Sequence, residues 1–231
     1  MEFEEQGFCI LLQCIGIEEL DRLKALLEQV RHSEAAKQKN GNVYGIRDLL
    51  NQIPQLRQFV AGNALREIIA RLSERPMQLV RAIYFDKTEN ANWGVLWHQD
   101  TTVALRQKAD TKGFDLWTVK AGICHAKPPV HYMQNMISLR IHLDNCDAGN
   151  GALRVIPGSH KYGYLNNAQI QDFTRDRAEV ICAAEQGSIM AMKPLLLHAS
   201  SSGSEPSRRR VLHFEFSPDA LPAGLEWYDA V

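Results

Sequence analysis

The residues after Pro76 form short apolar runs separated by turn-forming residues, and this pattern limits the possible folds more than any other feature of the chain. Gly, Pro, Asn and Asp punctuate the runs, which is typical of a β-sandwich or β-barrel. We therefore expect this part of the chain to be mainly β. The runs that predict strands are Met77–Phe85, Met136–Asp144, Ala152–Ile156, Val180–Ala183, Ser188–Met192 and Val211–Phe216.

The N-terminal part has helical periodicity instead. Apolar residues recur at helical spacing from Ile17 to Val30, which predicts an amphipathic helix. The segment Ile46–Leu72 predicts two helical pieces, with a break at Pro54 and with Asn63 as the N-cap of the second piece. Two other segments complete this part, a strand-like Gly7–Ile15 and a polar, loop-like Arg31–Asn42.

These patterns together indicate one domain spanning residues 1–231. A chain of this length can bury a sizeable core, and all-β barrels of this size are common. We expect a mainly β fold with helices, namely a double-stranded β-helix (the cupin-like jelly roll), with the N-terminal helices packed on one sheet. Residues 1–75 are expected to be mostly helical, 77–216 to form the jelly-roll core, and 101–135 to be an insertion or lid over the barrel mouth.

Composition excludes several classes of function. The net charge of −1 and a pI near 6.7 give no global basic field for nucleic acid or an anionic membrane. The five cysteines are odd in number and lack C-x-x-C spacing, so neither a disulfide framework nor a zinc knuckle is expected. The acidic N-terminus does not resemble a signal peptide, and no apolar run reaches the roughly 18 residues of a membrane span. We expect a cytoplasmic protein.

A His-x-Asp pair and a distant histidine form the strongest chemical motif. His98 and Asp100 lie two residues apart, so on a strand their side chains point to the same face. A second imidazole, which His198 can supply, would complete a 2-His-1-carboxylate triad that suits Fe(II) and leaves positions for substrate and O2. A Gly94-containing loop precedes this pair and two threonines follow it, as expected at a barrel mouth.

Two rival pairs have the same spacing. His142 and Asp144 share a strand face with Arg140, and a cation is unfavourable beside a metal. His213 and Glu215 would need a later histidine, and none follows them. We therefore favour the first pair. The remaining histidines are expected to be structural, with His160 ordering a turn and the others, His32, His125 and His131, forming ordinary hydrogen bonds.

The basic run 208–210 follows the distal histidine. Strand alternation places Arg208 and Arg210 on one face and Arg209 on the other, so only one side points into a barrel. A guanidinium there can bind a carboxylate in bidentate fashion, whereas solvated charges at a strand edge explain the other two. The order of these residues suggests an iron site with a dicarboxylate co-substrate beside it.

The chain resembles the phytanoyl-CoA dioxygenase family of Fe(II)/2-oxoglutarate-dependent oxygenases over most of its length, from the first strand to Phe216. The block from Asn150 to His160, with its Asn-Gly-x-Leu and Pro-Gly-Ser-His elements, is fairly specific to that family. The other matching blocks are Trp97–Asp100, Leu139–Asp144 and His198–Arg209.

The resemblance implies a double-stranded β-helix that uses Fe(II), 2-oxoglutarate and O2. By position, the iron ligands would be His98, Asp100 and His198, and Asp100 favours hydroxylation over halogenation. Arg209 would bind the distal carboxylate of 2-oxoglutarate with help from Ser200, and Arg140 falls where the family places a residue near the co-substrate, although the namesake has an aromatic there. The namesake acts on a long CoA ester and carries a targeting sequence that has no counterpart here, so the resemblance leaves open whether the substrate of this chain is a CoA ester.

The expected activity is hydroxylation of a small molecule, coupled to conversion of 2-oxoglutarate to succinate and CO2. Two alternatives stay open, a cupin-type metal enzyme that uses no 2-oxoglutarate and a non-catalytic ligand-binding jelly roll. No nucleic-acid or membrane partner is expected. Four residues are predicted near the mouth, where the lysines would suit an anionic substrate or simply a solvated loop: Trp97, Trp117, Lys120 and Lys127.

Overall fold

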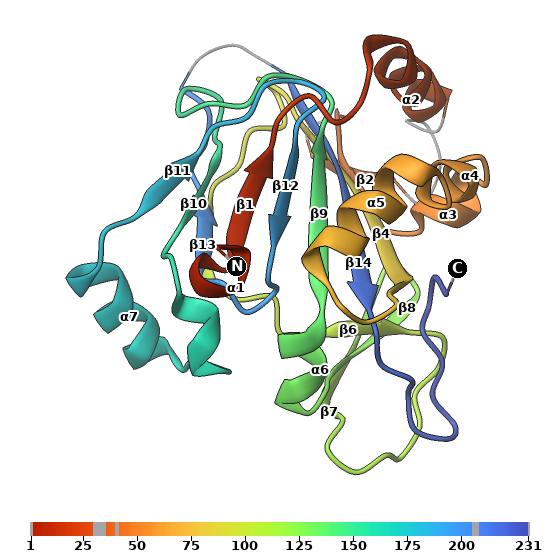
Figure 1. Cartoon of the computed structure of the whole chain (residues 1–231), viewed down its shortest axis with the longest axis vertical. Helices are drawn as coiled ribbons and strands as arrows, with labels where there is room; N and C mark the ends of the chain where they lie inside the picture. The colour runs from red at the N-terminus through yellow and green to blue at the C-terminus, as the bar shows by residue number, and fades with distance from the viewer. Residues whose placement is uncertain (1, 30–35, 40–41, 205–207, 231) are drawn as a thin grey trace.

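The computed structural model describes residues 2–29, 36–39, 42–204 and 208–230. Within these residues two antiparallel sheets face one another, and a third sheet extends from one end (Figure 1). The larger sheet has the strand order β1-β12-β9-β14-β4-β3-β2, and the smaller sheet the order β11-β10-β13-β5. The strands of the larger sheet are β1 (Phe8–Leu11), β2 (Ala36–Lys39), β3 (Asn42–Ile46), β4 (Gln78–Lys87), β9 (Ile137–His142), β12 (Ile189–Met192) and β14 (Arg209–Ser217).

The smaller sheet and the third sheet are built from shorter strands. The smaller one contains β5 (Val95–His98), β10 (Leu153–Val155), β11 (Val180–Cys182) and β13 (His198–Ser200). The third sheet, in the order β6-β8-β7, contains β6 (Val103–Leu105), β7 (Asp115–Lys120) and β8 (Ile123–Lys127). The helices are α1 (Glu2–Gln6), α2 (Ile17–Gln29), α3 (Leu49–Gln52), α4 (Leu56–Val60), α5 (Asn63–Leu72), α6 (Val130–Asn135) and α7 (Asn167–Asp176).

The two faces of the larger sheet differ in character because side chains alternate along each strand. The outer face of β14 and β4 carries apolar residues such as Leu212, Phe214 and Tyr84, which pack with the buried residues of α2–α5 in one core. The inner face of the same strands carries charged residues such as Arg209 and Arg81, which line a cavity between the sheets. The main apolar core therefore lies between sheet and helices. A smaller apolar cluster joins the two sheets at the β1–β12 side, and the cavity beside β14 and β4 is left for polar chemistry.

This architecture confirms the predicted fold class, a mainly β jelly roll with N-terminal helices packed on one sheet. Residues 101–135, predicted as an insertion or lid, contain the third sheet and α6. Thr101, Thr102 and Lys120 from this segment line the cavity. The role of lid and the domain boundaries stay predictions.

Several local predictions need correction. The segment Arg31–Asn42, predicted as a loop, contains β2 and the first residue of β3, while 30–35 and 40–41 lie outside the described residues. The segment Ile46–Leu72 contains three helices rather than two, and Gly62 rather than Asn63 precedes the last of them. The apolar run Leu195–Leu197, which is strand-like in sequence, forms no strand, because β13 begins only at His198.

Two further observations concern the described part of the chain. None of its helices combines the length and the apolar character needed to cross a bilayer. All five cysteines are free thiols, as the spacing predicted.

Candidate active site

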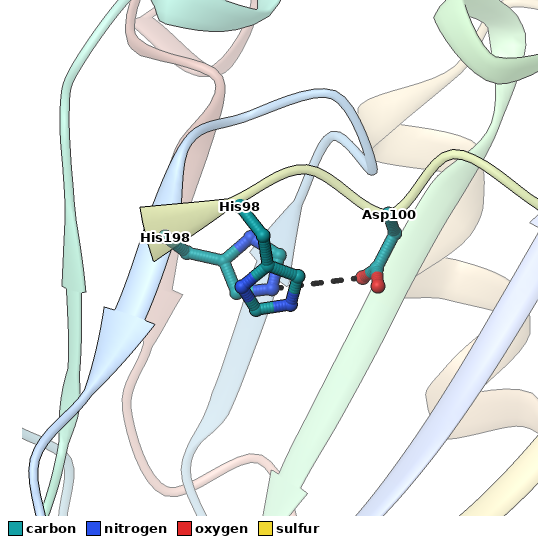
Figure 2. Close-up of side chains that lie close together, drawn as sticks. All are labelled: His98, Asp100 and His198. Atoms are coloured by element: carbon teal, nitrogen blue, oxygen red, sulfur yellow. Dashed lines mark ion pairs between the residues drawn. The ribbon is translucent and has the colours of Figure 1, made fainter. Parts of the chain in front are cut away.

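Two strands of the smaller sheet bring the two histidines of the motif together. β5 and β13 pair antiparallel in a register that sets His98 directly opposite His198, and the two ring centroids are 4.2 Å apart. β5 ends at His98, so Asp100 lies just beyond the strand instead of within it. Its backbone N–H donates to the carbonyl oxygen of Pro194 at 3.0 Å, and its carboxylate turns toward the imidazoles (Figure 2).

The hydrogen bonds of the two imidazoles prepare them for a metal. Nδ1 of His98 lies 2.8 Å from the carbonyl oxygen of Leu96, and Nδ1 of His198 lies 2.8 Å from that of Leu196. A carbonyl oxygen only accepts, so each Nδ1 carries the proton and each Nε2 presents its lone pair. One ligand atom from each histidine and from Asp100 lies within 4.8 Å of the other two. The donor set therefore fits a small divalent cation.

The charge states of the buried ligands also suit a metal. Burial would raise the pKa of Asp100, but the attraction of His198 and His98 outweighs burial and lowers that pKa to about 2. Burial lowers the pKa of His198 to about 4, partly offset by Asp100. At neutral pH the site therefore offers an ionised carboxylate and a neutral imidazole, the forms that bind metals.

The rival motifs do not build such a group. Among the described residues, no other cluster of His, Cys, Asp and Glu brings three ligand atoms this close. Asp144 accepts two hydrogen bonds from the guanidinium of Arg210 and one from its backbone N–H. His142 is buried, and neither of its ring nitrogens has a hydrogen-bond partner among the described residues. His213 and Glu215 contact each other at 3.3 Å. The structure thus agrees with the choice of His98 and Asp100 over both rivals.

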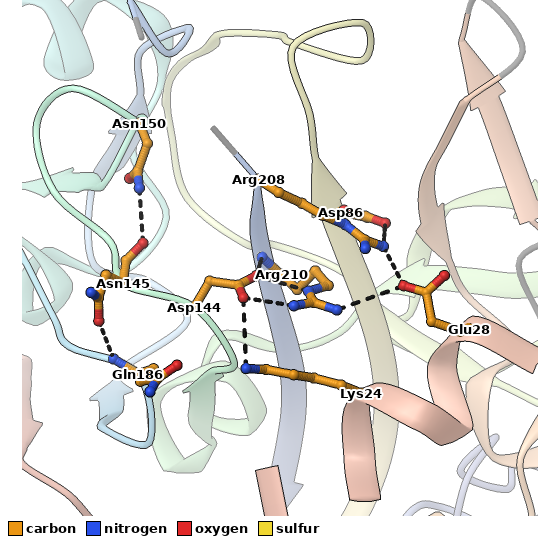
Figure 3. Close-up of polar contacts among 9 residues, drawn as sticks. All are labelled: Lys24, Glu28, Asp86, Asp144, Asn145, Asn150, Gln186, Arg208 and Arg210. Carbon is orange, nitrogen blue, oxygen red and sulfur yellow. Dashed lines mark hydrogen bonds and ion pairs between the residues drawn. The ribbon is translucent and has the colours of Figure 1, made fainter. Parts of the chain in front are cut away.

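The three consecutive arginines divide as strand alternation predicted. Arg208 binds Asp86 through Nε and Nη2 at 2.9 and 2.7 Å, and Arg210 binds Asp144 likewise at 2.8 and 2.7 Å (Figure 3). These two are therefore ion-paired, not simply solvated as expected. Arg209 points inward, is 4% exposed, and lies within 4 Å of no carboxylate of the described residues.

Ser200 and a buried lysine lie beside Arg209. Lys87 is the direct cross-strand partner of Arg209, and its Nζ donates to Ser200 Oγ at 3.1 Å and to the carbonyl oxygen of Ser201 at 2.7 Å. Ser200 Oγ donates to the carbonyl oxygen of Gly151 at 2.9 Å. Gly151 has φ +80°, and a Cβ there would meet Ser201 O at 2.5 Å and Lys87 Nζ at 2.6 Å. Only glycine fits this position, which explains the Asn-Gly element.

A chain of hydrogen bonds crosses the inner face of the larger sheet. Arg140 Nη1 donates to His213 Nδ1 at 3.3 Å, so His213 carries its proton on Nε2. Nε2 of His213 lies 3.3 Å from Oε1 of Glu215, to which it donates. The same oxygen accepts a hydrogen bond from Nη1 of Arg81 at 3.0 Å. Oε1 of Glu215 therefore accepts two hydrogen bonds, one from His213 and one from Arg81. This network holds the guanidinium groups of Arg81 and Arg140 in place.

One cavity of about 420 Å³ joins these groups, a size typical of small-molecule sites. All six residues predicted for the site lie in its wall: His98, Asp100, His198, Ser200, Arg209 and Arg140. Nε of Arg209 and Nε of Arg140 are buried and have no hydrogen-bond partner in the part of the chain that the structure describes. Buried donors without partners indicate a missing acceptor such as a ligand carboxylate.

Sequence reasoning missed three residues of the cavity wall, Arg81, Arg47 and Glu215, and also the buried Lys87, which contacts Ser200 of the wall. The signal for two of them is the two-residue spacing of Arg81, Ile83, Phe85 and Lys87, which places both cations on one strand face. The predicted strand ended at Phe85, so its last inward residue was lost.

Residues predicted near the mouth lie mostly elsewhere. Of the four, Lys120 is the one that lines the cavity in the described part of the chain. Trp97 stacks on Arg154, Lys127 lies over Tyr164, and the indole of Trp117 donates to Phe114.

The histidines that were predicted to be structural make local contacts with the backbone or with a neighbouring ring. His125 Nδ1 is 2.9 Å from the carbonyl oxygen of Ile123, and His131 packs on Tyr132. His160 lies in a 3-10 turn with Nε2 3.1 Å from the carbonyl oxygen of Glu4. His32 falls outside the described residues.

Comparison with known families identifies this arrangement. The family model for phytanoyl-CoA dioxygenase (PhyH) matches residues 3–211. The chain belongs to the phytanoyl-CoA dioxygenase family. No curated protein matches the sequence. The blocks that suggested this family from sequence all lie within the matched residues.

Solved structures show the same fold at low identity. SnoK, a non-heme α-ketoglutarate-dependent carbocyclase from nogalamycin biosynthesis, is 15% identical with a TM-score of 0.72, over 94% of this chain and 81% of SnoK. EctD from S. alaskensis, solved with 2-oxoglutarate and 5-hydroxyectoine, is 15% identical with a TM-score of 0.72, over 94% and 73%. HygX from Streptomyces hygroscopicus, solved with iron, is 14% identical with a TM-score of 0.64, over 94% and 84%. These three proteins therefore share the fold found here.

Proposed function

We propose that this protein is an Fe(II)/2-oxoglutarate-dependent dioxygenase that hydroxylates a small molecule. Membership of the phytanoyl-CoA dioxygenase family supports an oxygenase of this class. One observation carries the proposal: a ready 2-His-1-carboxylate group shares a cavity with a buried arginine that has no carboxylate partner among the described residues. A metal site alone would not need that arginine, and a binding module would not need the metal site.

The residues divide the work between two ends of the cavity. Nε2 of His98, Nε2 of His198 and a carboxylate oxygen of Asp100 would hold the iron, which with 2-oxoglutarate and O2 supplies the oxidising power when bound. Arg209 and the Ser200 hydroxyl would bind the distal carboxylate of the co-substrate. The Nδ1 hydrogen bonds to Leu96 and Leu196 keep both imidazoles oriented.

Arg140 extends this assignment along the cavity wall. It is buried, and its guanidinium carbon lies 5.7 Å from the centroid of the Phe85 ring. Burial and the neighbouring Arg209 lower the pKa of Arg140 to about 10, so it stays cationic at neutral pH. Its unpartnered Nε would meet the co-substrate or its product, the role that family position suggests.

The experiment is an anaerobic titration of the apoprotein with Fe(II) and then 2-oxoglutarate, followed by the visible charge-transfer band of the chelated keto acid. We expect a band in the parent protein and no band in His98→Ala. Arg209→Gln should need far more 2-oxoglutarate, whereas Arg66→Gln, on an exposed face of α5, should behave as the parent.

The outcomes separate the proposed function from the two alternatives. Tight metal binding without a band would favour a cupin-type enzyme that uses no 2-oxoglutarate. Absence of both metal binding and the band would favour a ligand-binding jelly roll. Detection of succinate together with an oxygenated product would complete the case for hydroxylation.

A further inference from the structure

We propose that Gln99 and Ser159 are positioning residues for the metal site, because they hold the segment 194–197, which leads into His198 and sets the direction of its imidazole. The inference rests on the proposed function, since it concerns how that site holds its metal. Neither side chain is one of the proposed metal ligands or co-substrate contacts. The basis of the inference is a set of hydrogen bonds from both side chains to peptide groups of this segment.

The segment 194–197 lies between β12 and β13 and belongs to neither strand. All four of its residues are buried, so its peptide groups need hydrogen-bond partners that no strand ladder supplies. Backbone groups provide two of them. The N–H of Asp100 donates to the carbonyl oxygen of Pro194 at 3.0 Å, and the N–H of Ile156 donates to that of Leu197 at 3.0 Å. The carbonyl of Leu195 and the N–H of Leu197 depend on side chains instead.

The amide of Gln99 holds the first half of the segment. Its Nε2 donates to the carbonyl oxygen of Leu195 at 2.7 Å and to that of Gly163 at 2.9 Å. Its Oε1 accepts from the backbone N–H of Leu165 at 2.8 Å. Gln99 is 7% exposed, so the three bonds use both N–H groups and the oxygen of an amide that is largely shielded from water. The residue between the first two proposed ligands therefore ties their part of the chain to the segment before the third.

The hydroxyl of Ser159 holds the second half of the segment. It accepts from the backbone N–H of Leu197 at 2.8 Å and donates to the carbonyl oxygen of Ile156 at 2.7 Å. Ser159 is fully buried, so without this hydroxyl the N–H of Leu197 would be left unsatisfied away from water. This contact gives the serine of the Pro-Gly-Ser-His element a physical role beside the metal site.

The two side chains act on one carbonyl group. Leu196 lies between the peptide groups that Gln99 and Ser159 hold, and its carbonyl oxygen is 2.8 Å from Nδ1 of His198. Because peptide groups are planar and both neighbours are fixed, this carbonyl has little freedom to rotate. The imidazole that donates to it therefore keeps Nε2 directed at the place where the other two ligand atoms converge.

The test measures Co(II) binding to the metal-free protein by competition with a chelating dye, and the visible absorption of the bound Co(II) at saturation. Gln99→Met keeps the length of the side chain and removes its hydrogen bonds, so it should weaken Co(II) binding about tenfold and shift the absorption bands. Ser159→Ala should act in the same direction. The double variant should weaken binding by less than the product of the two single effects, because both act on one carbonyl.

A matched variant separates positioning from a general loss of stability. Gln78→Met also removes a glutamine amide that donates to a backbone carbonyl, that of Asp219, but Gln78 lies outside the cavity wall. It should leave the affinity for Co(II) and the absorption as in the parent. Urea denaturation of each metal-free variant shows whether it folds. If Gln99→Met does not fold, the shorter Gln99→Asn provides the same test.

Several results would overturn the inference. Parental affinity and absorption in either Gln99→Met or Ser159→Ala would do so, and so would an equal loss of affinity in Gln78→Met. Single effects that multiply fully in the double variant would exclude a shared action through Leu196. A parent protein that binds no Co(II) would remove the proposed function and this inference with it, so failure of the inference alone is recognised by a parent that still binds the metal.

Discussion

The three neighbouring arginines at the start of β14 face two different environments. On the outer side, Arg208 and Arg210 bind carboxylates through two nitrogens each, and Glu28 of α2 contacts both of them at 2.7 and 3.6 Å (Figure 3). On the inner side, Arg209 is more deeply buried and has no such partner among the described residues. The outer charges are therefore satisfied by the fold itself, and the inner charge is left for a ligand.

The difference teaches how to separate structural from functional charges. Burying a charge without a partner is unfavourable, whereas a bidentate pair at a partly exposed site regains much of the lost hydration. A fold that keeps Arg209, Arg140 and Lys87 close together inside therefore accepts a loss of stability. The outer arginines link α2, β4 and β14, and nothing about them requires a ligand.

Replacement of Arg209 should give the largest effect on binding. Arg209→Gln should weaken 2-oxoglutarate binding about 100-fold, because a bidentate charged contact in a dry site is lost. The free energy of unfolding of the ligand-free protein should stay the same or rise, because an unpaired buried charge is removed. Calorimetry on the Ni(II) protein measures the first quantity and urea denaturation the second.

Arg210→Gln is the matched control for that change. It should leave 2-oxoglutarate affinity within about twofold and lower stability instead. If Arg210→Gln abolished co-substrate binding while Arg209→Gln did not, the assignment of the two faces would be wrong.

Removal of an outer carboxylate should give the next largest effect, on stability alone. Asp86 is fully buried and accepts hydrogen bonds from Nε and Nη2 of Arg208. Asp86→Asn should lower the free energy of unfolding by about 2 kcal/mol, because it weakens a bidentate pair that joins β4 to the residue before β14. Glu226→Gln, in an exposed pair with Arg106, should change it by less than about 0.5 kcal/mol. Equal effects in the two variants would remove the distinction between buried and exposed pairs.

Much of this site was predictable from local sequence, and the failures have a physical cause. Period-two alternation correctly separates Arg209 from its neighbours. The short apolar runs correctly predict strands at β4, β9, β10, β11, β12 and β14. The partnership of Lys87 with Arg209 is set by strand register between residues far apart in the chain, which no local pattern encodes. The hairpin β2–β3 was missed because the sequence Ala36–Lys39 is mostly polar and shows no alternation of apolar and polar residues, the local signal of a strand.

The metal group illustrates the same limit. His98 and His198 could be paired from sequence only by their chemistry, and their contact depends on the β5–β13 register. The strand geometry used to place Asp100 was wrong in detail, since the strand ends at His98. The predicted proximity still holds, because the backbone bond from Asp100 to Pro194 turns the chain back toward the site.

The buried Lys87 should make the affinity for 2-oxoglutarate depend on pH. Burial, and then the charge of Arg209, lower the pKa of Lys87 to about 7 in the ligand-free protein. A bound dicarboxylate favours the charged lysine and raises that pKa again. Binding should therefore take up a proton above pH about 7, and affinity should fall there by up to tenfold per pH unit while staying flat below.

Calorimetry of 2-oxoglutarate binding in buffers of different ionisation enthalpy measures the proton uptake. Lys87→Met should remove it, and Lys108→Met should not. Stability of the ligand-free protein should show the opposite sign, because the unfolded lysine titrates near 10.4 and unfolding takes up a proton above pH about 7, so this residue's contribution rises with pH in that window. A proton uptake that persists in Lys87→Met would assign it to another group.

The smallest expected effect is on stability, from replacement of Glu28, which contacts the two outward-facing arginines. Glu28 is 41% exposed at its side chain, and it connects α2 to Arg208 and Arg210. Both arginines keep their carboxylate partners when Glu28 is replaced, so Glu28→Gln should lower the free energy of unfolding by only about 0.5 kcal/mol, and high salt should abolish the difference. Urea denaturation at low and high ionic strength measures it. A loss as large as that of Asp86→Asn would mean that the outer arginines depend on the helix, and that the outer face is held together by one cooperative network and not by two independent pairs.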